Sequence, residues 1–222
     1  MTRGRIKGDH EVRRAEIARA ACAVILRNGL AATSLAEIAR EMGYTTGVLR
    51  HYFLSKEELL FHAKNSLFDA AIDARRDGAQ DLQGRDKLTS VVTAMIAVNP
   101  AAVDRYRLLA AFNGSAIGDE ALMSKQHARN QENIEALSAL IAELQACGLA
   151  LKGLDPRMAA LGLLALIDGL WEHIIMKPQD WGGDDLAALV MAHVRTTIFG
   201  ELPPEAETDR RTGAPSAIPR ET

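Results

Sequence analysis

Apolar residues recur three or four positions apart along almost the whole chain, and no segment shows the strict apolar–polar alternation of a half-buried strand. This period is typical of amphipathic helices that each bury one face. The expected helices cover residues 11–28, 34–42, 46–53, 55–76, 86–98, 100–113, 119–147, 156–176 and 184–198. The pattern therefore predicts an all-α fold of about nine helices.

Short polar motifs mark several of the expected helix ends. Ser34-Leu-Ala-Glu37 and Ser55-Lys-Glu-Glu58 have the spacing of capping boxes, in which two side chains satisfy backbone N–H groups at a helix start. Gly43 follows the second expected helix, and Thr45 precedes the third. The sequence thus predicts two short helices joined by a tight turn.

Composition narrows the class of protein. Half of the residues, 48%, are hydrophobic, which is enough for a core without disulfides or metals. Cys22 and Cys147 match no disulfide or ligand spacing, so we expect a protein of the reducing cytoplasm. We expect no signal peptide and no membrane partner, because no run approaches the roughly 20 apolar residues of a membrane span.

The net charge of −3 is unevenly distributed. Residues 1–60 contain ten Lys or Arg residues against seven Asp or Glu residues, so the rest of the chain is the acidic part. A basic end on an acidic body indicates that only the N-terminal part meets a polyanion.

The turn at Gly43 is compatible with a DNA-reading helix-turn-helix, whose second helix enters the major groove. That helix would open with Thr45, Thr46 and Gly47, which are small enough to approach base edges, and Arg50 could pair with a guanine. A glycine between two helices is also common in any helical bundle, and Thr45 is equally compatible with a plain cap. Spacing alone leaves both interpretations open.

The longer string resembles the DNA-binding domain of the tetracycline-repressor (TetR) family. It reads Ser34-Leu-Ala-Glu-Ile-Ala-Arg-Glu-Met-Gly-Tyr-Thr-Thr-Gly-Val-Leu-Arg-His-Tyr-Phe-Leu-Ser-Lys-Glu-Glu-Leu-Leu60. The resemblance implies a three-helix DNA-binding bundle, a connecting helix and a larger helical domain for ligand and dimerisation. Tyr44 and Arg50 depart from the family pattern, in which a small aliphatic and an aromatic residue are common.

The motif and the resemblance together predict the DNA-contacting residues and the domain boundaries. The expected DNA contacts are Thr33, Thr45, Thr46, Gly47, Arg50, His51, Tyr52 and Lys56, with Arg3, Arg5 and Lys7 on phosphates or in the minor groove. The expected parts are a basic arm (1–10), the helix-turn-helix domain (11–54), a connecting helix (55–76), a ligand-binding and dimerisation domain (77–202) and a disordered tail (203–222).

The second half is similar, over residues 161–171, to the repressors that control choline-to-glycine-betaine synthesis genes. A quaternary ammonium is held by aromatic faces and often a carboxylate, so a choline-like effector is one candidate. The candidate ligand residues are Tyr106, Phe112, Asn113, Asp168, Trp171 and Glu172. The aromatic residues are few, and they are also compatible with ordinary core packing; Asp168 could serve the ligand, a dimer contact or the core.

A two-fold operator needs a two-fold protein, so we expect a homodimer. The candidate interface residues are Ala165, Gly169, Ala187, Val190, Met191 and Val194, which could instead close the monomer core. The sequence contains no catalytic or cofactor motif, and His127, His173 and His193 are scattered, so we expect no enzyme, no cofactor and no metal.

The sequence thus predicts a DNA-binding transcriptional regulator, a dimeric repressor that a small molecule releases from its operator. The alternative is a helical interaction or small-molecule-binding module that does not bind DNA.

Overall fold

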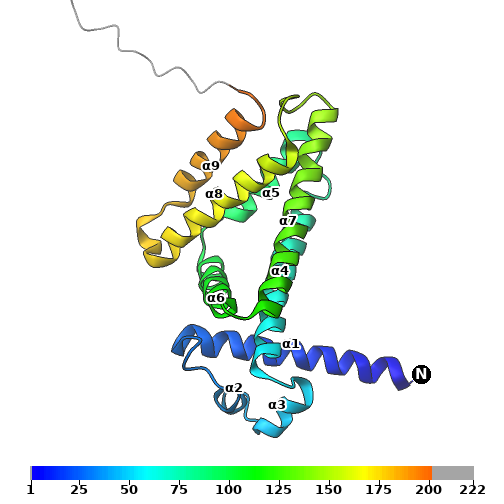
Figure 1. Cartoon of the computed structure of the whole chain (residues 1–222), viewed down its shortest axis with the longest axis vertical. Helices are drawn as coiled ribbons and strands as arrows, with labels where there is room; N and C mark the ends of the chain where they lie inside the picture. Colours follow the sequence, from blue (N-terminus) through cyan, green and yellow to red (C-terminus); the bar gives the residue numbers. More distant parts are fainter. Residues whose placement is uncertain (1, 202–222) are drawn as a thin grey trace, which may run out of the picture.

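The computed structural model describes the backbone of residues 2–201 and the side chains of residues 10–67 and 69–201. Helices and short connections make up this part of the chain (Figure 1), which confirms the all-α prediction. The elements are α1 (Thr2–Asn28), α2 (Leu35–Glu41), α3 (Thr46–Tyr52), α4 (Lys56–Ala79), α5 (Gly84–Ile96), α6 (Pro100–Ala116), α7 (Glu120–Ala146), α8 (Pro156–Met176), the 3-10 turn η1 (Pro178–Asp180) and α9 (Gly183–Thr197).

Helices α1 to α3 and the start of α4 form a small N-terminal bundle. Its core contains Ile17, Ile38, Leu49 and Leu59, each fully buried. The Ser34 capping box forms as predicted, with Ser34 and Glu37 bonding each other's backbone N–H groups. Gly43 ends the α2 turn at φ 69°, a left-handed conformation that costs a residue with a Cβ free energy.

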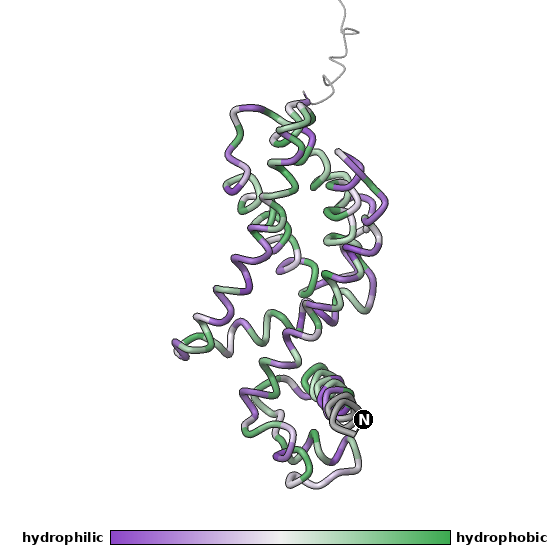
Figure 2. Tube along the Cα trace, turned by 90° about the vertical axis from the view of Figure 1, so that its right-hand side faces the viewer, coloured by the Kyte–Doolittle hydropathy of each residue, from purple (hydrophilic) through white to green (hydrophobic). Residues whose placement is uncertain are grey.

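A separate apolar cluster joins this bundle to the rest of the molecule. Cys22 and Ile25 from α1 pack with Leu60 from α4 and with Leu108 and Phe112 from α6. Figure 2 shows α1 almost end-on below the larger domain, and α4 passes from one part into the other. Because α4 contributes to both parts, a movement of α4 relative to α6 would be transmitted to the N-terminal bundle.

The larger domain is built around α8, which packs against α6, α7 and α9. Leu163 and Ile167 of α8 are fully buried, and Trp171 is 2% exposed. By length and composition alone α8 could cross a membrane, contrary to the expectation that no segment comes near that limit. In the structure its apolar stripe is the centre of the domain core, and Asp168 and Glu172 interrupt its other side.

Three local features differ from the sequence-based expectations. Helix α1 begins at Thr2, well before residue 11, because residues 2–10 contain no proline and continue the helical turn. Helix α4 continues to Ala79, so the polar stretch after residue 76 is partly helical. At the start of α4 Ser55 caps the Glu58 N–H, but the Glu58 carboxylate accepts from Leu54 N rather than closing the box.

Candidate DNA-reading surface and effector cavity

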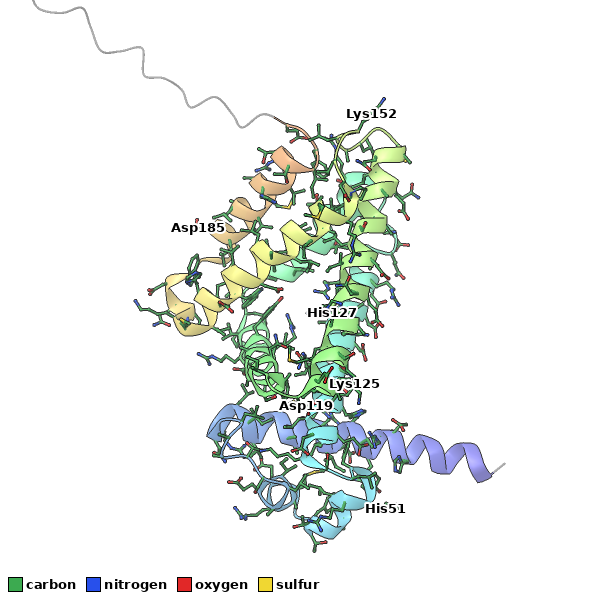
Figure 3. The ribbon with its side chains drawn as sticks, viewed as in Figure 1. His51, Asp119, Lys125, His127, Lys152 and Asp185 are labelled. Carbon is green, nitrogen blue, oxygen red and sulfur yellow. The ribbon has the colours of Figure 1, made fainter. Side chains whose placement is uncertain are left out.

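The recognition helix α3 exposes one row of side chains. Thr45, Gly47, Arg50 and His51 are exposed, while Leu49 on the opposite side is fully buried. In Figure 3 His51 lies on the outer side of the N-terminal bundle, beside α1. Thr45 is the N-cap residue of α3 by position, but its hydroxyl makes no capping hydrogen bond. The hydroxyl is therefore available to a partner outside the chain.

A cluster around Arg14 holds the corner between α3 and α4. The Arg14 guanidinium donates to the Tyr52 carbonyl oxygen at 2.5 Å and to Glu58 Oε1 at 3.2 Å, and it lies 4.1 Å from the centre of the Phe53 ring. The Leu54 N–H and Arg14 together lower the pKa of Glu58. These contacts hold the C-terminal end of α3 against α1 and α4.

Tyr44, which departs from the family pattern, has a structural partner in α1. Its hydroxyl accepts a hydrogen bond from Arg13 Nη1 at 2.9 Å, and the same guanidinium pairs with Glu16 at 2.5 Å. The turn between α2 and α3 is therefore tied to α1 by a polar contact. A small aliphatic residue at position 44 could not make this contact.

Two of the expected DNA contacts are engaged inside the protein. Thr33 is 2% exposed, and its hydroxyl donates to the Gly29 carbonyl oxygen at 2.8 Å. Lys56 donates to the Leu30 carbonyl oxygen at 3.2 Å. Tyr52 is half-buried, with its ring 4.9 Å from that of His10. The side chains of Arg3, Arg5 and Lys7 lie outside the described residues.

The larger domain contains a cavity of about 760 Å³ that opens between α4, α5, α6, α7 and α8. Five of the six predicted ligand residues line it: Tyr106, Asn113, Asp168, Trp171 and Glu172. Phe112 does not. It packs in the apolar cluster that joins the two parts, and it lines a second cavity of about 460 Å³ between α4, α6, the start of α7 and the connection after α1. Helix α6 thus lines both cavities, because Phe112 and Asn113 point to different sides of it.

The two aromatic residues of the larger cavity are packed on each other. The Tyr106 and Trp171 rings stack with centroids 3.9 Å apart and an interplanar angle of 7°. Trp171 Nε1 donates to the Met95 carbonyl oxygen at 3.0 Å, and the Arg105 guanidinium lies 5.5 Å from the Tyr106 ring centre. The ring faces that an aromatic cage would offer to a cation are therefore largely occupied by the protein's own side chains.

Charged groups on different helices face this cavity. Asp168 lies one helical turn before Glu172 on α8, and burial together with the neighbouring Glu172 carboxylate raises the pKa of Asp168. Arg75 on α4 is half-buried, and burial lowers the pKa of its guanidinium. Burial and the nearby Asp168 raise the pKa of Tyr106 to about 12, while Arg75 acts in the opposite direction. Tyr106, Arg75 and Asp168 thus line the same cavity from three different helices.

A polar contact connects the cavity wall to the junction of the two domains. Lys64 on α4 is 5% exposed, and its Nζ donates to Asn113 Oδ1 at 2.7 Å. Lys64 lines the smaller cavity and Asn113 lines the larger one. Burial lowers the pKa of Lys64 to about 8.

The predicted dimer residues fall into three groups. Val190 and Val194 are fully buried in the core of the chain itself, as the monomer-core alternative allows. Ala165 lines the cavity. Gly169 is exposed on α8, and Ala187 and Met191 are half-buried on α9, which runs along the outer side of α8 in Figure 1.

Comparison with known proteins agrees with this architecture. Residues 17–63 match the family described as bacterial regulatory proteins, tetR family, and residues 84–198 match the C-terminal domain of BetI-type transcriptional repressors. The chain is 31% identical over 204 residues to the HTH-type transcriptional regulator PksA of Bacillus subtilis, covering 91% of this chain and 97% of that protein. The chain belongs to the TetR family of transcriptional regulators. Its helix-turn-helix is therefore a DNA-binding unit, which confirms the prediction from residues 34–60.

Three further proteins extend the comparison. The transcriptional regulator BetI of Paraburkholderia phymatum is 34% identical over 192 residues, which are 84% of this chain and 92% of that protein. A TetR-family regulator from Rhodococcus sp. has a similar fold, with a TM-score of 0.74, 24% identity and coverage of 84% and 98% of the two chains. A transcriptional regulator from Saccharomonospora viridis, solved in complex with choline, matches with a TM-score of 0.76, 18% identity and coverage of 85% and 98%.

Sequence reasoning missed Arg14, Lys64 and Arg75. Arg14 and Arg75 look like ordinary solvated residues in a charged stretch, and only packing places them against other helices. Lys64 could have been noticed, because it follows Leu60 by four residues and so falls on the apolar stripe of α4.

Proposed function

We propose that this TetR-family protein is a cytoplasmic homodimeric repressor that a small-molecule effector releases from its operator. The observation that supports the effector role most strongly is the cavity of about 760 Å³, a size typical of small-molecule sites, with α4 as one of its walls. The same helix supplies Leu59 to the core beneath the recognition helix. An effector in the cavity can therefore act on the helix that supports the DNA-reading end.

In this proposal Thr45, Thr46, Gly47 and Arg50 read base edges in the major groove. Arg50 is exposed with no ion-pair partner among the described residues, so its guanidinium is available for two hydrogen bonds to a guanine. The exposed His51 and the partly exposed Tyr52 contact phosphates, and Arg3, Arg5 and Lys7 follow the backbone as an arm. Lys56 gives one ammonium N–H to the Leu30 carbonyl oxygen and can offer the other two to a phosphate. Thr33 supports the loop before α2, because its N–H donates to the Leu30 carbonyl oxygen and its hydroxyl donates to that of Gly29.

The dimer in this proposal uses the outer faces of α8 and α9. The exposed Gly169 on α8 allows close approach, and α9 contributes the half-buried Ala187 and Met191. Leu189 and Met158 are exposed on the same two helices, at 48% and 61%, and an apolar side chain of this size gains free energy when a partner covers it. Val190 and Val194 support the interface from inside the core.

Release follows from the geometry of a two-fold operator. Two recognition helices must stand about one DNA turn, roughly 34 Å, apart to occupy successive major grooves. Effector binding favours a conformer in which α4 shifts and this spacing is lost. A coupling of about 1–3 kcal/mol changes operator affinity about 5- to 150-fold.

Gel retardation of the protein's own upstream DNA tests this proposal. We expect binding at low salt that weakens steeply as salt rises, because phosphate contacts release counterions. The double substitution Thr46→Ala with Arg50→Ala should abolish retardation while circular dichroism and oligomeric state remain those of the parent. Thr93→Ala with Arg107→Ala, exposed residues of the larger domain, is the matched control and should bind normally. Equal binding by both double variants, or no binding by the parent, would favour the module without DNA binding.

A further inference from the structure

The larger cavity contains charged side chains that the protein itself leaves unpaired. Among residues 10–67 and 69–201, no carboxylate lies within ion-pair distance of Arg75, and no cation lies within ion-pair distance of Asp168 or Glu172. Ten other ion pairs form in the same part of the chain, some of them between partners far apart in sequence. Unpaired charges also occur on the protein surface, as at Arg50, but Arg75, Asp168 and Glu172 line one cavity from two different helices.

Burial makes the unpaired charge of Arg75 costly, whereas Asp168 and Glu172 are exposed at the cavity wall. A guanidinium or carboxylate that is partly removed from water loses hydration free energy unless an opposite charge replaces it. The half-buried Arg75 has no such replacement, and Asp168 stands one turn from a second acid of the same sign. A ligand with an anionic group near Arg75 and a cationic group near Asp168 and Glu172 would offset the lost hydration of the guanidinium and the repulsion between the two acids.

The arrangement also indicates where such partners would sit. Arg75 comes from α4 and Asp168 from α8, and Tyr106 from α6 lines the same cavity with them. The two charges do not pair directly, so a single ligand that extends past Tyr106 could reach one with each end. The stack of Tyr106 on Trp171 leaves little free aromatic face for a bare quaternary ammonium.

We propose that the effector is amphoteric: it carries an anionic group that binds Arg75 and a cationic group that binds Asp168 and Glu172. This inference rests on the proposed effector role of the cavity. It narrows the ligand class from small molecules in general to compounds such as amino acids or betaines with separated charges. A cation without an acid group would use only half of the site.

Three compounds of equal chain length test the proposal: 6-aminohexanoate carries both charges, hexanoate only the anion and hexylamine only the cation. We expect calorimetry on the full chain at pH 7 and low salt to show 6-aminohexanoate binding roughly 10- to 100-fold more tightly than either single-charge compound. The homologues 4-aminobutanoate and 8-aminooctanoate then test which separation of charges fits best.

Substitutions test which residue binds the carboxylate of 6-aminohexanoate and which binds its ammonium group. Arg75→Gln should reduce 6-aminohexanoate binding to the level of hexylamine and leave hexylamine unchanged, whereas Asp168→Asn should reduce it to the level of hexanoate. Arg107→Gln and Asp104→Asn are matched controls, because this i, i+3 pair on α6 lies outside the cavity. Both controls should bind the probe as the parent does.

Equal binding of all three compounds, tightest binding of hexylamine, or no binding of any member of the series would overturn the proposal. Operator retardation measured on the same preparations separates this failure from failure of the proposed function. A protein that binds its operator but shows no preference for 6-aminohexanoate would remain a regulator with a different ligand class. A protein that prefers 6-aminohexanoate but ignores DNA would keep the cavity chemistry and lose the regulatory role.

Discussion

Lys64 gives a stability prediction that can be worked out from the structure. Its side chain is 5% exposed between α4 and α6, and its Nζ donates to Asn113 Oδ1 at 2.7 Å. Burial lowers the pKa of this ammonium from 10.5 to about 8. The perturbation we consider is Lys64→Met, which keeps the length and apolar stem of the side chain and removes the charge.

The pKa difference sets both the sign and the magnitude. At about 1.4 kcal/mol per pKa unit, lowering the pKa of Lys64 from 10.5 to about 8 corresponds to about 3 kcal/mol. Below pH 8 the folded chain must keep the buried ammonium protonated, so the whole cost is present. Between about pH 8 and 10.5 the unfolded chain binds this proton and the folded chain does not, so the Lys64 contribution to stability rises with pH.

Urea unfolding of parent and variant between pH 7 and 10.5, at fixed protein concentration, measures the difference. We expect Lys64→Met to be more stable than the parent by about 1–3 kcal/mol at pH 7, since loss of the Asn113 bond offsets part of the gain. The advantage should disappear toward pH 10.5. Burial raises the pKa of Cys22 to about 11 and that of Tyr106 to about 12, and both groups destabilise the fold as pH rises. These contributions are common to both proteins and cancel in the difference.

Lys152→Met is the control, because Lys152 is exposed at the far end of the larger domain (Figure 3). Its difference from the parent should stay constant over the same pH range. If Lys64→Met is less stable than the parent at pH 7, or its difference is flat between pH 8 and 10.5, the argument from burial is wrong.

Three further substitutions test the packing that positions the two sites. Leu49→Ala, at a fully buried position under the recognition helix, should cost about 2–5 kcal/mol in urea unfolding; no loss would show that the bundle tolerates the cavity. Gly43→Ala should lower the melting temperature through a cost of about 1–2 kcal/mol at φ 69°, and Gly43→Asn should cost less, so equal costs would contradict the backbone explanation. Trp171→Phe removes the bond to the Met95 carbonyl and should cost about 1–3 kcal/mol, whereas a neutral result would mean that water replaces the indole N–H.

Local sequence was sufficient where the determining interactions are local. The Ser34 capping box joins residues three positions apart, and the stop at Gly43 depends on the conformation of one residue. For the same reason the starts of α6 and α8 at Pro100 and Pro156 could be predicted, with Asn99 and Asp155 as their caps. The DNA-reading row on α3 follows from these local rules, because the period of a helix decides which residues share a face.

Sequence could not decide which face of a helix meets which neighbour. Phe112 and Asn113 are adjacent in the chain and were both expected at the ligand, but only Asn113 lines the larger cavity, since successive helical residues point about 100° apart. Val190 was expected at a dimer surface and lies in the core of its own chain. Both placements depend on the packing of several helices at once.

The sequence by itself determined the helices, the ends that carry caps or turn residues, and the DNA-reading motif, because these depend on interactions within a few positions. The start of α1 and the end of α4 carry no such signal, and both were predicted wrongly. Only the tertiary structure decided that Arg14 holds the corner of the recognition helix, that Lys64 bridges to Asn113, and that Arg75 and Asp168 share a cavity. These residues are separated by dozens of positions from their neighbours in space. Their pKa values and their partners depend on burial between packed helices. They can therefore be known only from the tertiary structure.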